Sequence, residues 1–316
     1  MKKFLLKSAL VLLVGAFLLL DGIGISAALR DRTFQPHDNY FCNDFRKGYH
    51  EGLAADIVLL GNSRVLSGLS ATEMEKLTGA RVLQLGYSSS NISITRLVLE
   101  SYLRKAKKPP ETAILEVSWF TFNPDRTGFH SKFAGDLAMN DPCLLRYSGR
   151  YPELFQSWAL RLAEHALTGQ ALPYTDYTIA KRMDYPVNDS TVKDYTLDTA
   201  AMERIFPDHI AGVDRQLLED FNAIVDLCSR RQIRLVLYTG PEDAGFTAMQ
   251  RDRDAIRRIY LAAGERPGVT YMDYTSGGTY YRSSFENILL NSDHIYFDDI
   301  FTRRFTADLK TAGSDE

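Results

Sequence analysis

One serine stands where a strand is expected to end, in a position that suits nucleophilic chemistry. Ser63 lies in the motif GNSR (61–64), directly after the apolar run 55–60. In an open parallel sheet, ligands bind outside the carboxyl ends of the strands, so the residues that follow each strand are informative. A serine on such a turn, opening towards a helix, presents its hydroxyl and a backbone N–H to whatever it attacks. Ser63 is therefore the first candidate for a reactive residue.

Other polar or small residues follow the remaining expected strands. A loop of small residues from Gly86 to Asn91 has accessible backbone amides, and Ser118 and Trp119 follow the third strand. Past the fifth strand comes the run 291–294, Asn-Ser-Asp-His, just before a closing helix. These segments are expected to meet at one edge of the sheet.

Alternating strands and helices are needed to position these residues. The run 55–60 is apolar apart from Asp56, as expected for a strand that is buried on both faces along most of its length. Ser70 and Glu73 have the spacing of a capping box, which predicts a helix ending near Gly79. Further strands are expected at 81–85, 112–117, 233–238 and 269–272, and further helices at 92–107, 213–231, 252–263 and 298–310. This alternation predicts an α/β domain with a three-layer, flavodoxin-like parallel sheet and helices on both faces.

The alternation lapses between residues 121 and 207. Tyrosines, prolines and scattered polar turns fill this stretch, with one helical piece at about 153–167. It is too long for an ordinary loop, so we interpret it as an inserted or lid subdomain.

The N-terminus has the pattern of an export signal. Three lysines (Lys2, Lys3 and Lys7) border a largely apolar stretch that extends to Leu29. The small residues at 25–27 could be a cleavage site, but Asp21 and Gly22 interrupt that region. A stretch of this length can also cross a bilayer as an uncleaved anchor, with the lysines on the cytoplasmic side. The anchor is the favoured interpretation, with residues 1–31 as the membrane segment and 32–316 as the extracytoplasmic domain.

Composition excludes some functions. The net charge of −3 provides no concentrated basic face, which argues against nucleic acid as a partner. The three cysteines form no CxxC motif or Cys/His cluster, so no metal site is expected. Cys228 falls on the apolar face of a predicted helix and is expected to be a core residue.

The pairing of LLGNSR (59–64) with Asp293-His294 resembles the SGNH hydrolase and acyltransferase superfamily, over roughly residues 56–309 with the middle stretch unmatched. The likeness is strongest to membrane-anchored members such as the D-alanine-transfer protein of teichoic acid assembly and the alginate O-acetyltransferases. The resemblance implies that Ser63 is the nucleophile and His294 the general base. It also implies an oxyanion hole formed by Ser63, Gly86 and Asn91, and a single-pass protein of a bacterial cytoplasmic membrane.

The sequence departs from the family pattern near the histidine. The family usually has an aspartate three residues before it, where this chain has Asn291. Asn291 and the adjacent Asp293 are therefore both candidates to orient the imidazole. Arg64 is either a substrate-binding residue or a salt-bridge partner. Trp119 is either a substrate-binding residue on which a sugar ring stacks, or a core or cleft-wall residue, and the second interpretation is favoured.

Two hypotheses of different classes follow. The first is a serine esterase or O-acyltransferase that acts on a cell-surface or exported polysaccharide, needs no cofactor, and takes its acyl group from a donor. The second is a catalytically degenerate binding or scaffold partner of a membrane-bound O-acyltransferase. A metal-dependent phosphoesterase ranks last, because clustered Asp and His ligands at strand ends are missing.

Overall fold

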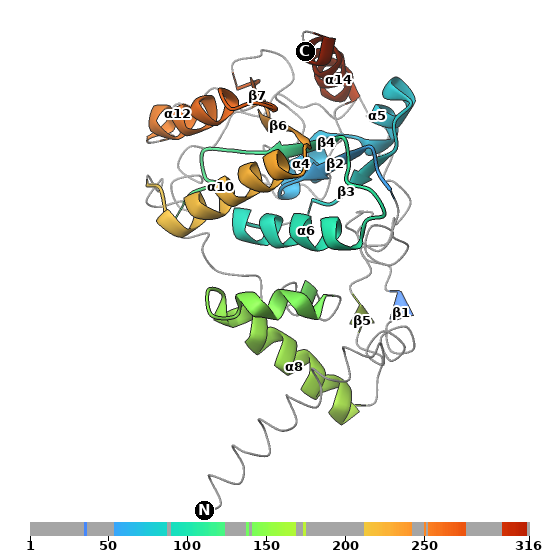
Figure 1. Ribbon diagram of the computed structural model, residues 1–316, viewed down its shortest axis with the longest axis vertical. Helices are drawn as coiled ribbons and strands as arrows, with labels where there is room; N and C mark the ends of the chain where they lie inside the picture. The colour runs from blue at the N-terminus through green and yellow to red at the C-terminus, as the bar shows by residue number, and fades with distance from the viewer. Residues whose placement is uncertain are drawn as a thin grey trace, which may run out of the picture. The chain divides into compact units, whose positions relative to one another are not determined.

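The computed structural model describes residues 54–86, 90–123, 137–138, 141–168, 212–241, 250, 252–275 and 299–314, and two short strands at 35–36 and 173–174. The larger part is built on a five-stranded parallel sheet with the order β3-β2-β4-β6-β7 (Figure 1). Its strands are β2 (Ile57–Leu60), β3 (Val82–Gln84), β4 (Thr112–Glu116), β6 (Arg234–Thr239) and β7 (Val269–Asp273).

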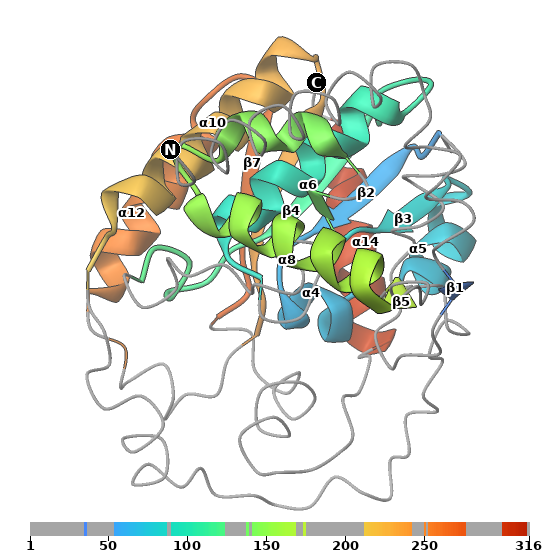
Figure 2. The same cartoon turned by 90° about the horizontal axis from the view of Figure 1, so that it is seen from below.

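Helices cover both faces of this sheet, which confirms the predicted α/β fold class. One face carries α5 (Ala71–Thr78) and α14 (Asp299–Ser314), which pack against each other. The opposite face carries α6 (Ile92–Lys105), α10 (Arg215–Arg230) and α12 (Arg253–Gly264). Figure 2 looks onto the face of α6 and α10, with α14 behind the strands.

Successive side chains along each strand point to opposite faces of the sheet, so a separate hydrophobic layer lies on each face. Ile57 and Leu59 of β2 belong to one buried cluster together with Met74 of α5 and Phe305 of α14. All four residues of β2 are buried, as its continuous apolar run predicted.

The opposite layer contains a group of packed aromatic rings. The ring centroids of Phe122, Phe221 and Tyr260 lie 5.4 to 5.8 Å from one another, in tilted and edge-to-face arrangements that aromatic rings prefer. Cys228 of α10 is fully buried, which confirms its predicted place in the core.

Helix α5 begins and ends where its capping signals predicted. The Ser70 hydroxyl accepts a hydrogen bond from the Glu73 amide, and Gly79 ends the helix with φ of 73°. The backbone N–H of Ser70 donates to Thr302 Oγ1 of α14 rather than to Glu73. The first hydrogen bond of the capping box, from the Glu73 amide to the Ser70 hydroxyl, therefore forms within the helix. The second, from the Ser70 amide, is made to α14 instead of to the Glu73 side chain.

The chain divides into two compact units, Met1–His37 with Ser131–Asp176, and Asp38–His130 with Tyr177–Glu316. The second unit contains the sheet. The first contains the 3₁₀ helix η2 (Pro142–Tyr147), helix α8 (Pro152–Thr168), and a parallel pair of two-residue strands, β1 (Gln35–Pro36) and β5 (Pro173–Tyr174). Helix α8 confirms the helical piece expected at 153–167, whereas the extent of the insertion, 121–207, stays a prediction.

The expected membrane segment, residues 1–31, lies outside the described residues. Within the described ranges, no helix is both long enough and apolar enough to cross a membrane.

Candidate active site

The turn that carries Ser63 has a defined backbone. Gly61 has φ of 140°, and a Cβ atom there would lie 2.9 Å from Glu116 Cβ, so only glycine fits. Asn62 caps the helix that follows, because its Oδ1 accepts a hydrogen bond from the Arg64 amide at 2.8 Å. Ser63 is the first residue of this helix, α4 (Ser63–Gly68). The side chain of Ser63 is outside the described part of the structure.

This turn lies at the point where the strand order reverses. Strand β2 pairs with β3 on one side and with β4 on the other. The chain leaving β2 runs to β3 and the chain leaving β4 runs to β6, in opposite directions, which opens a crevice beyond the carboxyl ends of β2 and β4. Ser63 follows β2 by three residues, so its backbone is at the place where doubly wound sheets bind ligands.

Gly86, the predicted oxyanion donor, packs tightly against the same turn. A Cβ on Gly86 would lie 2.3 Å from Val65 Cγ1 of α4. The Gly86 amide donates a hydrogen bond to Gln84 Oε1 at 3.1 Å, and Gln84 Nε2 donates to the Val65 carbonyl at 3.3 Å. Gln84 thus links the segment carrying Gly86 to the helix that begins at Ser63.

A second link joins the same two segments. The Ser90 hydroxyl donates to the Gly61 carbonyl at 2.8 Å, and Ser90 is buried. The turn after β2 and the loop after β3 are therefore held together by side chains from the β3 side.

Asn91 begins the next helix. Its Oδ1 accepts a hydrogen bond from the Ile94 amide at 2.9 Å, which makes Asn91 the N-cap of α6. The side chain is buried, and this capping bond explains why an asparagine suits the position. Its proposed role in an oxyanion hole stays a prediction.

Arg64 lies in a buried ion pair. Its Nε is 3.5 Å from Glu116 Oε1, and its Nη2 donates to the Pro241 carbonyl at 3.5 Å. The guanidinium also lies over the ring of Phe120, 5.8 Å from the centroid, within the range of a cation–π contact. Of the two roles expected for Arg64, the structure shows the salt bridge, while substrate binding stays a prediction.

Glu116 is a site residue that the sequence patterns did not single out. It occupies the last position of β4, on the face of the sheet that also carries Tyr238. Burial, followed by the nearby Glu116 carboxylate, raises the pKa of Tyr238 well above its ordinary value. An acidic residue ending a buried apolar strand is the sequence signal that could have identified it.

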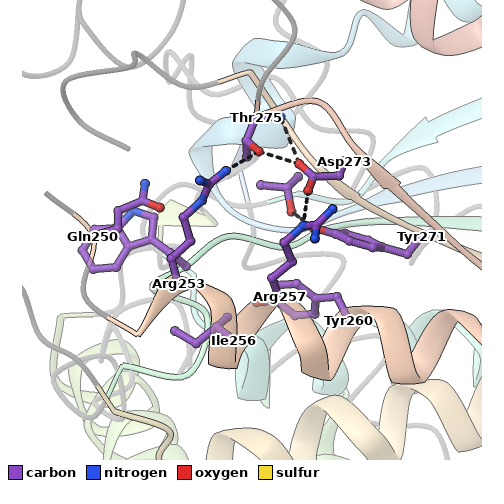
Figure 3. Close-up of a pocket in the computed structure, with 10 residues that line it drawn as sticks. Gln250, Arg253, Ile256, Arg257, Tyr260, Tyr271, Asp273 and Thr275 are labelled. Carbon is purple, nitrogen blue, oxygen red and sulfur yellow. Dashed lines mark hydrogen bonds and ion pairs between the residues drawn. The ribbon is translucent and has the colours of Figure 1, made fainter. Parts of the chain in front are cut away.

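Trp119 is buried and forms one wall of a small hollow, whose lining from α12 and β7 is drawn in Figure 3. The other walls come from the ends of β6 and β7 and from α12. This position agrees with the expectation that Trp119 is a core or cleft-wall residue. Contact of Trp119 with a substrate stays a prediction.

The remaining predicted site residues, Asn291, Asp293 and His294, lie outside the described residues. Their catalytic roles beside Ser63 therefore stay predictions. In the ranges that are described, no group of His, Cys, Asp and Glu side chains could hold a metal ion.

Comparisons with known proteins return similar structures but no family. No protein-family model and no curated protein matches the sequence significantly. A GDSL-like lipase from Bacteroides thetaiotaomicron aligns over 85% of this chain and 96% of its own, with 10% identity and a TM-score of 0.39. A protein of Bacteroides fragilis described as an acylhydrolase aligns over 90% and 92%, with 10% identity and a TM-score of 0.38. Similarity at this level identifies neither a substrate nor an activity.

Proposed function

We propose that this protein is an SGNH-type serine hydrolase or O-acyltransferase that acts on a cell-surface or exported polysaccharide through an acyl-serine intermediate. The observation that carries the proposal is the position of Ser63 at the start of α4, in the turn after β2, where the strand order reverses. Gly86, which follows β3, packs against the same turn. The proposed nucleophile and the proposed oxyanion donor therefore follow neighbouring strands, which supports the proposal.

The general base is assigned to His294, which stands five residues before Asp299, the first residue of α14. Five residues of chain span at most about 18 Å. Phe301, in the first turn of α14, packs on Tyr238 of β6, whose carboxyl end is at the same edge of the sheet. The described structure around this segment is therefore compatible with a histidine that reaches the crevice.

The proposed reaction has two steps. The Ser63 hydroxyl attacks the acyl carbonyl while His294 takes its proton, and backbone donors stabilise the negative oxygen of the tetrahedral intermediate. The intermediate collapses to an acyl-serine, and the leaving alcohol receives the proton from His294. Water or a sugar hydroxyl then attacks the ester, giving hydrolysis in the first case and acyl transfer in the second.

Covalent labelling of the full-length protein with a fluorophosphonate probe tests the nucleophile. The wild-type protein is expected to be labelled at Ser63, and Ser63→Ala is expected to lose the label. Ser67→Ala is the matched control, because it removes a second hydroxyl from the same short helix and is expected to leave labelling unchanged. Absence of label in folded wild-type protein, or equal labelling of Ser63→Ala, would reject the serine mechanism.

A second candidate function is a noncatalytic scaffold that partners a membrane-bound O-acyltransferase. The observation favouring it is the hydrogen bond from the Gly86 amide to Gln84 Oε1, which occupies the donor that an oxyanion would need. Asn291 in place of aspartate points the same way. The substitution Gln84→Leu separates the two candidates, because it removes the acceptor of the Gly86 amide. In an enzyme, the Gly86 amide would then be able to stabilise an oxyanion, and the fluorophosphonate would label Ser63 faster. A scaffold would stay unlabelled.

A further inference from the structure

A second feature of the carboxyl edge of the sheet is the hollow beside α12. It is walled by α12, by the ends of β6 and β7, and by Trp119. Its 260 Å³ of empty space includes open solvent, and the enclosed part has room for little more than one water-sized group. The hollow can therefore take one small group, such as a carboxylate, while the rest of a ligand would lie outside it.

Among the described residues that line the hollow, the charged side chains are two arginines and one aspartate. Arg253 and Arg257 stand four residues apart on α12, so they project from one side of the helix, and Asp273 ends β7. In Figure 3 both guanidinium groups reach from α12 towards Asp273 and Thr275. These described side chains together carry a net charge of +1 at neutral pH.

The two arginines differ in how far their charge is already neutralised. Arg257 Nε lies 2.6 Å from Asp273 Oδ2 in an ion pair. Arg253 Nη2 donates to the uncharged Thr275 Oγ1 at 2.6 Å. Asp273 in turn accepts hydrogen bonds from the Thr275 amide at 3.0 Å and the Thr275 hydroxyl at 2.6 Å. The excess positive charge therefore belongs to Arg253, with its position fixed by Thr275.

The chemistry of Arg253 suits an anion. A guanidinium has five N–H donors, and its planar fork matches a carboxylate. Within the described ranges, the bond to Thr275 is the hydrogen bond that the structure gives Arg253. Arg253 is half-buried, which weakens the competition of bulk water for its charge. It also begins α12, so the positive end of the helix dipole adds to the field there.

The rest of the lining suits a polar molecule of modest size. The hydroxyls of Tyr271 and Thr239 are 2.9 Å apart at one wall, and the ring of Tyr260 lies 5.5 Å from that of Tyr271. Tyrosine and tryptophan side chains offer flat apolar faces together with polar edges.

We propose that this hollow is a binding site for a monoanionic carboxylate carried on a small polar body, with Arg253 as the residue that recognises the carboxylate. A single negative charge matches the net charge of the described lining, whereas a phosphate carries between one and two negative charges at neutral pH. The site does not require Ser63 to be reactive. If the proposed acyl chemistry holds, the hollow is at the same edge of the sheet and would bind the acidic group of a substrate.

Ligand-dependent thermal stability of the full-length protein tests this proposal without any variant. The probes are glucuronate, glucose and inorganic phosphate, since glucuronate and glucose differ in the oxidation of one carbon to a carboxylate. Glucuronate is expected to raise Tm as its concentration increases, because a ligand that binds the folded state stabilises it. Glucose is expected to leave Tm unchanged, and phosphate is expected to raise Tm by less than glucuronate. Equal effects of glucuronate and glucose, no effect of either, or a stronger effect of phosphate would overturn the proposal.

Two variants on the same helix locate the site. Arg253→Gln is expected to weaken glucuronate binding at least tenfold. Arg258→Gln is the matched control, because Arg258 is exposed and outside the lining, with its Nε donating to the Asp254 carbonyl. Equal affinity of Arg253→Gln and wild type would overturn the assignment. Labelling of Ser63 in the same samples separates this outcome from failure of the serine mechanism.

Discussion

Arg64 and Glu116 form an ion pair in which Nε and Oε1 are 3.5 Å apart and the side chains are 5% and 1% exposed. The pair joins the helix that begins at Ser63 to the last residue of β4, across the point where the strand order reverses. Because water is excluded from both groups, each depends on the other to compensate its lost hydration. The geometry of the nucleophile turn is therefore coupled to a residue that does not take part in the proposed reaction.

Glu116→Gln is expected to destabilise the fold, because it leaves the buried charge of Arg64 without its counterion. Breaking a buried pair in this way typically costs about 3–5 kcal/mol. The free energy of unfolding, measured with urea, checks the prediction. Glu111→Gln serves as the control, since Glu111 is 77% exposed just before the same strand and its loss should cost under about 0.5 kcal/mol. Equal stability of the two variants would show that the Arg64–Glu116 pair contributes little.

Gly86→Ala is expected to destabilise the protein by about 1–3 kcal/mol, the usual cost of overpacking a tight interior. Its Cβ would approach Val65 Cγ1 to 2.3 Å, so α4 or the loop after β3 must move. Gly68→Ala, on the same helix, places its Cβ in open space and should be neutral or stabilising. Thermal unfolding of both variants checks this difference, and combining Gly86→Ala with Val65→Ala should recover part of the lost stability.

The sequence predicted local elements well because their signals are local. Helix α10 was expected at 213–231 and spans Arg215–Arg230, since its apolar face repeats with helical periodicity. Helix α5 has the boundaries that Ser70 and Gly79 dictate. Each of these signals acts within a few residues of chain, so no knowledge of tertiary packing was needed.

Long-range pairings could not be predicted in the same way. Glu116 was not predicted because its partner is 52 positions away in the sequence, and strand order alone brings the two together. The bond from Gln84 to the Val65 carbonyl, 19 positions away, was also unexpected, and it holds Gln84 where its Oε1 accepts the Gly86 amide that the sequence predicted to be accessible. The orientation of His294 depends on tertiary packing too, and it stays a prediction.

Cys228 and Cys143 are expected to differ sharply in reactivity towards iodoacetamide. Burial raises the pKa of Cys228 to about 12, so at pH 8 it remains a protonated, inaccessible thiol. Cys143 is free and exposed, and should be alkylated in the native protein. Peptide mass spectrometry after a timed reaction measures both. Cys228 should react only after denaturant is added, and fast native alkylation of Cys228 would contradict its place in the core.

The contribution of Asp273 to stability is expected to depend on pH. Burial raises its pKa, but hydrogen bonds from Thr275 and Arg257 lower it by more, so the folded-state pKa is below the ordinary 3.8. A carboxyl with a lowered pKa stabilises the fold fully above its unfolded-state value and loses that contribution as pH falls through the folded-state value. The difference in unfolding free energy between wild type and Asp273→Asn should therefore be constant above about pH 5 and should shrink below pH 3.8.

Urea titrations at pH 7, 5 and 3 measure this difference in unfolding free energy. Asp254→Asn, at an exposed position of α12, is the control, and a difference for Asp273→Asn that grows towards pH 3 would contradict the proposed hydrogen bonding of the carboxylate.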